Sequence, residues 1–176
     1  MLHSFGLRFK PWNLYAEAIR AEIGRRGNVD FQDHSLLTAR LNSDKSDGPF
    51  VDYLYALNAD QPPDLIVAIG APAANFVQRH RKDLFPKTPM VFTVVQERRV
   101  DFEKLTEYDT VVASSTDVGL FFESILRVLP LTNTISVVVG ASPNETFGWK
   151  RDVETPLRWQ GGCNFDGTTN YRSKTF

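Results

Sequence analysis

The sequence predicts an α/β domain with a doubly wound, mostly parallel sheet. Short and nearly continuous apolar runs such as "DLIVAIG" at residues 64–70 are typical of strands buried on both faces. Segments of helical periodicity, each about ten to fifteen residues long, separate these runs and indicate crossover connections. With 176 residues, of which 42% are hydrophobic, the chain can bury a core. We therefore expect right-handed crossovers and helices on both faces of the sheet.

The first half of the chain predicts two strands and two helices. The opening "LHSFG" is an expected strand and turn, and residues 11–25 are an expected helix that begins at Pro11. The apolar face of this helix carries residues spaced three and four apart, namely Trp12, Tyr15, Ala16, Ile19 and Ile23. "NVDFQDHSLL" at 28–37 alternates as a half-buried strand does, and a second helix presents Phe50, Leu54 and Leu57 on one side.

The second half repeats the same alternation from the buried run at 64–70 onward. A predicted helix at 72–82 leads to a strand at 89–95, and a polar loop leads to a strand at 110–115. A further helix at 117–129 and a strand at 134–140 complete the pattern.

Charge and composition exclude several classes of partner. The chain has 20 Lys and Arg against 21 Asp and Glu, which leaves no electrostatic footprint for nucleic acid or a membrane surface. Cys163 is the single cysteine, so a disulfide framework is excluded. The sequence has no apolar run near the roughly 18 residues that span a bilayer, and "MLHSFGLRFKPW" lacks the regions of a signal peptide. As written, the chain is expected in the cytoplasm.

Motifs for cofactor binding and catalysis are missing from the sequence. It has no phosphate loop, no three-glycine dinucleotide fingerprint and no G-x-S-x-G nucleophile elbow. His3, His34 and His80 lack the spacing of metal ligands. We therefore expect no cofactor, no metal site and no catalytic residue, and we favour ligand binding over catalysis.

In sheets of this class, ligands bind beyond the carboxyl ends of the strands, so the turns there are the candidates. Several of these turns combine glycine or small residues with backbone N–H groups ahead of a helix, which suits an anionic or polar ligand group. Gly70 and Asp117 have a simpler interpretation, the first as a tight turn and the second as a helix cap.

A family resemblance extends over nearly all of residues 2 to about 150. It is carried by "LHSFG", "PW", "GPFVDYLYAL", "DLIVAIGAPAANFVQRHRKDLFP", "TPMVFT", "ESILRVLP" and "VVVGASPNE", in that order. These segments resemble the periplasmic-binding-protein-like sensor region of bacterial sensor histidine kinases, which is related to ABC-transporter substrate-binding proteins. The resemblance implies a type I periplasmic-binding-protein fold, in which two flavodoxin-like lobes hold a small ligand in the cleft between them. In full-length relatives the sensor is periplasmic, and a transmembrane helix passes lobe closure to PAS and kinase modules.

The resemblance also implies which turns of the first lobe line the cleft. The predicted ligand-binding residues are Ser4, Phe5, Gly6, Gly70, Ala71, Pro72, Gln96, Glu97, Ser115, Thr116 and Asp117. Hydroxyls, backbone N–H groups and one aromatic ring would suit a small polar or aromatic metabolite, with Phe5 as a stacking face.

The family pattern is incomplete at both ends of this chain. Residues 1–145 are expected to form the first lobe, and the chain opens inside its first strand. Residues 146–176 are expected to be the start of a second lobe or an out-of-frame, disordered tail, since "RWQGGCNFDGTTNYRSKTF" has no apolar periodicity. A truncated or frameshifted gene is the favoured explanation. A single lobe would bind ligand weakly, and its exposed apolar faces would favour self-association.

These inferences predict an incomplete small-ligand-sensing module without catalytic activity. One alternative is a solute-binding component of an ABC transporter, which has the same fold and a different docking partner. Another is a small flavodoxin-like enzyme or switch domain, disfavoured because Asp117 lacks the acidic neighbours that hold Mg²⁺ in receiver domains. Any kinase activity would belong to a longer relative.

Overall fold

The computed structural model describes residues 1–38, 47–115, 117–132, 134–136 and 164–166. The chain divides into two compact units, Met1–Ser115 and Thr116–Phe176, and each is described by itself. The predicted lobe boundary at residue 145 lies outside the described residues, as does most of the predicted tail, and both stay predictions.

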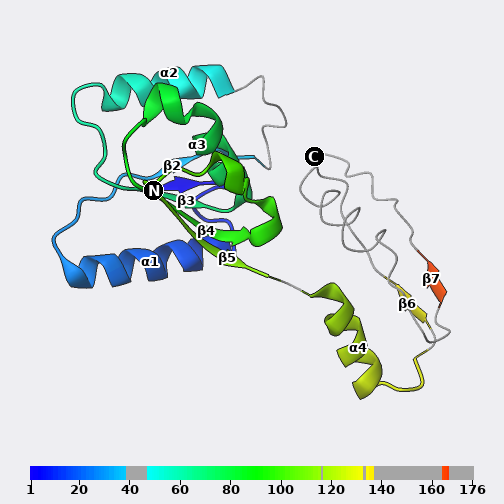
Figure 1. The fold of residues 1–176 in the computed structure, drawn as a ribbon. Coiled ribbons are helices and arrows are strands. Elements are labelled where there is room, and N and C mark those ends of the chain that lie inside the picture. Colours follow the sequence, from blue (N-terminus) through cyan, green and yellow to red (C-terminus); the bar gives the residue numbers. More distant parts are fainter. Residues whose placement is uncertain (39–46, 116, 133, 137–163, 167–176) are drawn as a thin grey trace, which may run out of the picture. The chain divides into compact units, whose positions relative to one another are not determined.

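The first unit contains a five-stranded, fully parallel sheet with the strand order β2-β1-β3-β4-β5 (Figure 1). The strands are β1 Leu2–His3, β2 His34–Ser35, β3 Ile66–Ile69, β4 Met90–Gln96 and β5 Asp109–Ser114. This order is that of flavodoxin-like sheets, and it confirms the predicted α/β fold class.

Helices cover both faces of this sheet, as a doubly wound fold requires (Figure 1). They are α1 Trp12–Arg26, α2 Asp47–Asn58 and α3 Ala71–Leu84. Between β4 and β5, where we expected only a polar loop, the chain forms two 3-10 turns, η2 Glu97–Arg99 and η3 Phe102–Lys104. Three-residue turns of this kind are too short for an apolar periodicity to reveal them in a sequence.

The larger core lies between the sheet and the helices α2 and α3. Phe92 and Met90 of β4 are almost fully buried there against Val77 and Phe76 of α3. Small residues at the start of α3, Ala73 among them, let the helix approach β3 closely. On the other face of the sheet, α1 forms a smaller core cluster. Its buried members are Ala16, Val67 and Ile69.

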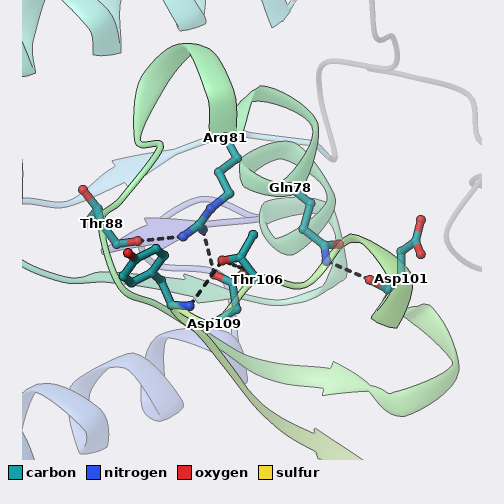
Figure 2. A network of polar contacts seen from close by, with 7 residues as sticks. Gln78, Arg81, Thr88, Asp101, Thr106 and Asp109 are labelled. Atoms are coloured by element: carbon teal, nitrogen blue, oxygen red, sulfur yellow. Dashed lines mark hydrogen bonds and ion pairs between the residues drawn. The ribbon is translucent and has the colours of Figure 1, made fainter.

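A buried ion pair fastens α3 to the amino ends of β4 and β5 (Figure 2). Arg81 Nη1 lies 2.7 Å from Asp109 Oδ1, and their side chains are 8% and 1% exposed. Arg81 Nη2 also donates to Thr88 O at 3.0 Å. The second carboxylate oxygen of Asp109 accepts from Thr106 N at 2.8 Å and from Thr106 Oγ1 at 2.9 Å. Because both charged groups are hydrogen-bonded, this network can stay buried.

A second polar cluster joins β1, α1 and the segment that leads into β2. Asp33 lies 2.9 Å from His3 Nε2 through Oδ1, and its Oδ2 accepts a hydrogen bond from Arg20. The Arg20 guanidinium also stands 4.8 Å from the centre of the Phe31 ring. Burial raises the pKa of Asp33, but the hydrogen bonds from His3 and Arg20 outweigh it and hold that pKa below its usual value.

The second unit contains α4 Val118–Val128, β6 Thr134–Ser136 and β7 Asn164–Asp166. Strands β6 and β7 pair in parallel. The predicted helix at 117–129 is confirmed, and Asp117 is its N-cap because its side chain accepts from Leu120 N at 3.0 Å. Residues 164–166, inside the predicted tail, thus form a short strand.

Candidate functional site

The candidate site is the carboxyl edge of the parallel sheet in the first unit. In the register of the central strands, Leu2 pairs with Ala68 and His3 with Ile69, so Ser4 and Gly70 leave the sheet next to each other. The chain runs from β1 outward to β2 and then returns past β1 to β3, so the strand order reverses between β1 and β3. Such a switch point opens the crevice that ligands use in open α/β sheets.

Ser4 ties the ends of these two central strands to helix α3. Its buried hydroxyl donates to Ile69 O at 2.7 Å and accepts from Ala73 N at 2.9 Å. Its carbonyl oxygen accepts from Thr38 N at 3.1 Å and from Thr38 Oγ1 at 2.7 Å. The hydroxyl therefore has both a donor and an acceptor use inside the fold.

Gly70 is required by the close approach of Ser4. Its φ of 89° lies in the region that L side chains rarely adopt, and a Cβ added there would stand 2.7 Å from Ser4 Oγ. The N–H of Gly70 donates to Thr93 O at 2.9 Å, which anchors the turn to β4. The interpretation of Gly70 as a tight turn is confirmed, and its predicted ligand contact stays a prediction.

The start of α3 offers fewer backbone N–H groups to a ligand than we expected. Pro72 has none, Ala73 donates to Ser4, and Ala74 N donates to Gly70 O at 3.1 Å. The N–H of Ala73 is therefore already bonded within the fold, because the side chain of Ser4, which follows β1, reaches the helix. Sequence reasoning missed this contact, since it depends on β1 and β3 being neighbours.

Phe5 lies in a row of stacked aromatic rings after β1. Its ring centre is 4.9 Å from that of Phe9 and 5.4 Å from that of Trp12, with interplanar angles of 26° and 24°. Trp12 continues the row to Tyr15 at 6.2 Å. Phe5 is half-buried, whereas Phe9 is 47% exposed, so Phe9 presents the larger ring surface to solvent. In the sequence, the spacing of four residues from Phe5 to Phe9 and of three from Phe9 to Trp12 is the pattern that could have indicated this row of rings.

At the end of β4 the strand contains a bulge. The pairing with β5 shifts between Thr93 and Val95, and the extra residue Val94 has a φ of 54°. Gln96 then pairs with Ser114, and Glu97 opens the turn η2 with an exposed side chain. Neither the bulge nor its strained valine follows from the apolar run that predicted this strand.

The side chain of Gln96 holds a neighbouring arginine. Its Oε1 accepts from Arg98 Nε at 3.2 Å and from Arg98 Nη2 at 2.8 Å. Arg99 is half-buried, and burial together with the positive charge of Arg98 lowers the pKa of its guanidinium. Both arginines were visible in the "QERR" turn of the sequence, but they were interpreted as a solvated surface.

The structure brings most of the predicted site together at this one edge. This edge holds the residues at or just after the carboxyl ends of β1, β3, β4 and β5, namely Ser4, Phe5, Gly6, Gly70, Ala71, Pro72, Gln96, Glu97 and Ser115. Thr116 lies outside the described residues, and Asp117 belongs to the second unit, where it caps α4.

Comparisons of the chain with protein families, with curated proteins and with solved structures find no match. Within the described ranges, no group of three or more His, Cys, Asp or Glu side chains is placed to hold a metal ion. Over the same ranges, no helix is both long enough and apolar enough to span a membrane. The structure thus shows an α/β domain with a five-stranded parallel sheet.

Proposed function

We propose that this chain is a small-ligand-sensing module of the solute-binding kind, without catalytic activity, similar to the extracytoplasmic sensor of a two-component histidine kinase. The observation that carries the proposal is the convergence of four candidate turns on one sheet edge, around the switch point between β1 and β3. This is the place where open α/β sheets bind small molecules.

The edge combines a rigid base with exposed groups of several chemical kinds. Ser4 and Gly70 lock the two central strands and α3 together, which gives the surrounding turns a fixed frame. On this frame stand the ring of Phe9, the hydroxyl of Ser115 and the carboxylate of Glu97, all exposed. Such a mixture suits a small ligand with an apolar ring or chain and a few polar substituents.

Binding is favoured over catalysis because the polar groups at the switch point are already used by the fold. The hydroxyl of Ser4 is bonded to Ile69 O and Ala73 N, neither of which is a base that could activate it. His3 is adjacent in sequence, but its Nε2 is directed to Asp33. With these partners, Ser4 and His3 have structural roles in the proposed module.

The affinity of this chain alone should be low. A sensor of this kind gains affinity when two lobes enclose the ligand, and a single edge supplies only part of the enclosure. We therefore expect dissociation constants on the order of millimolar, which corresponds to about −4 kcal/mol of binding free energy.

The test is a ligand-observed NMR screen of small polar and aromatic metabolites on the full chain. A hit should lose affinity roughly 2- to 10-fold in Ser115→Ala, which removes one exposed hydroxyl, and also in Phe9→Ala. Lys87→Ala is the matched control, because Lys87 is exposed ahead of β4, at the opposite edge. Hits that weaken equally in the control, or a screen without any hit, would overturn the proposal.

A further inference from the structure

We propose that Leu37, in the segment that follows β2, is a further ligand-contacting residue of the carboxyl edge, where its side chain supplies an apolar wall beside Gly6. The inference rests on the ligand-sensing function proposed above. It names the part of the ligand that this position accepts, which is an apolar ring or the apolar end of a chain.

The first argument is the backbone conformation of Leu37. Its φ of 50° lies in the left-handed region, which glycine adopts readily and leucine does not. Val94 is the other non-glycine residue with a positive φ in the described ranges, and its side chain packs against the smaller core cluster. Neither core cluster of the described residues includes Leu37. Packing in the core thus accounts for a valine at position 94, but it does not account for a leucine at position 37.

The second argument is the set of hydrogen bonds that fastens this segment to the chain after β1. Thr38 N and Oγ1 both donate to Ser4 O, at 3.1 and 2.7 Å. Ser35 Oγ donates to Phe5 O at 2.5 Å, and the N–H of Leu37 donates to that same hydroxyl at 3.4 Å. Because these bonds lie on both sides of Leu37, they hold its backbone in the strained conformation. Strain that is held in this way clusters at sites where a ligand is bound.

The third argument is the place of the Leu37 side chain. Its Cδ2 methyl lies 3.5 Å from the point where a Cβ on Gly6 would stand, and Leu37 is 38% exposed. Among the described residues, no other atom outside the two neighbours of Gly6 comes within 4 Å of that point. Gly6 is one of the residues that the sequence predicts to bind ligand. A ligand group about the size of a methyl can therefore occupy this point and remove the leucine methyl from water.

The experiment follows the leucine methyl resonances of the full chain, ¹³C-labelled at these methyls, during titration. Benzyl alcohol, an apolar ring with one hydroxyl, is the binding probe, and glycerol, which has hydroxyls without an apolar part, is the blank. We expect a saturating shift of the Leu37 methyls with benzyl alcohol and no shift with glycerol. The methyls of Leu57, an exposed leucine in the last turn of α2, should stay unchanged.

One substitution at two exposed leucines separates binding from stability. Leu37→Gly should raise the melting temperature by roughly 2–5 °C, because glycine adopts the positive φ without strain. It should also weaken the affinity for benzyl alcohol roughly 3- to 10-fold, because the apolar contact is lost. Leu57→Gly is the matched control, since Leu57 is 45% exposed in a helix. It should lower the melting temperature by roughly 3–5 °C and leave the affinity unchanged.

Gly6→Ala tests the position of the contact. The new methyl would stand at an ordinary van der Waals distance from Leu37 Cδ2, so the melting temperature should change by less than about 2 °C. The affinity for benzyl alcohol should fall about 2- to 5-fold, because the methyl occupies the point that the ligand needs. The inference would be overturned by a lower melting temperature in Leu37→Gly, by shifts that stay linear with benzyl alcohol, or by equal affinities in Leu37→Gly and Leu57→Gly.

The outcomes separate this inference from the proposed function. Metabolites that bind at the edge, combined with silent Leu37 methyls, would leave the sensing function standing and remove the apolar contact. Saturating binding of benzyl alcohol at Leu37, combined with a metabolite screen that finds nothing, would keep the apolar contact and remove the sensing function.

Discussion

The two edges of the parallel sheet treat their polar groups in opposite ways. At the amino edge, Arg81 and Asp109 are buried and bonded to each other, and Thr88 and Thr106 add further hydrogen bonds to the pair (Figure 2). At the carboxyl edge, the polar side chains of the outer turns are half-buried or exposed, and Gln96 Oε1 accepts hydrogen bonds from Arg98. The difference separates a part of the fold that serves stability from a part that, under the proposed function, would contact a ligand.

The largest expected effect comes from breaking the amino edge. Asp109→Ala leaves the Arg81 guanidinium buried without its carboxylate, which should cost about 3–5 kcal/mol in the free energy of unfolding. Urea denaturation of the full chain measures this loss. The double variant Arg81→Met/Asp109→Leu should lose clearly less, since no charge stays buried. Equal losses in the single and double variants would mean that packing, and not charge burial, dominates there.

Gly70→Ala should break the frame of the carboxyl edge. The new Cβ meets Ser4 Oγ at 2.7 Å and forces a strained φ, so a loss of about 1–3 kcal/mol in stability is expected. In Ser4→Ala/Gly70→Ala the oxygen is gone, and the combined loss should be smaller than the sum of the two single losses. A double-mutant cycle by thermal unfolding checks this coupling, and strict additivity would contradict the proposed contact.

The Asp33 cluster predicts a pH dependence of stability near the start of the sheet. The pKa of the Asp33 carboxyl is below its usual value in the folded chain. Its contribution to the free energy of unfolding is therefore present above the pKa of the unfolded state and is lost as the pH falls through the pKa of the folded state. Asp33→Asn should cost about 1–2 kcal/mol at neutral pH. The difference in the free energy of unfolding between wild type and Asp33→Asn should become smaller in acid, and urea unfolding at several pH values measures this change. A constant difference would exclude the proposed charge effect.

The smallest effect on stability is expected at the exposed end of β5. Ser115→Ala should change the free energy of unfolding by no more than about 0.5 kcal/mol, because the side chain is exposed. The same substitution weakens ligand binding if the edge is the site. Thermal unfolding of the unliganded wild type and of Ser115→Ala measures the difference in stability. A substantial loss in the variant would mean that Ser115 stabilises the fold.

Much of the fold could be predicted from the sequence, because apolar runs and helical periodicity report burial directly. The run at 64–70 became β3 and its turn, and the segment 72–82 lies within α3. The turns at the carboxyl edge were found for the same reason, since they follow the buried runs. The proximity of Ser4 and Gly70, in contrast, follows from the pairing of β1 with β3, which no local sequence pattern predicts.

What could not be predicted depends on contacts between distant segments. The hydrogen bond from Ala73 N to Ser4 Oγ joins residues that lie far apart in sequence, and the Arg81–Asp109 pair joins α3 to the second strand after it. The bulge at Val94 is hidden because an extra valine in an apolar run looks like any other strand residue. The hydrogen bonds from Arg98 to Gln96 could not be predicted, because the direction of the "QERR" turn follows from that bulge.

The most direct test of the account is chemical-shift mapping of a bound metabolite over both edges of the sheet in the ¹⁵N-labelled full chain. We predict saturating shifts of the amides of residues 4–6, 70–71, 96–99 and 114–115, with those of residues 87–90 and 106–109 unchanged. Shifts that cluster at the amino edge, or that spread evenly over both edges, would contradict the assignment of binding to the carboxyl edge.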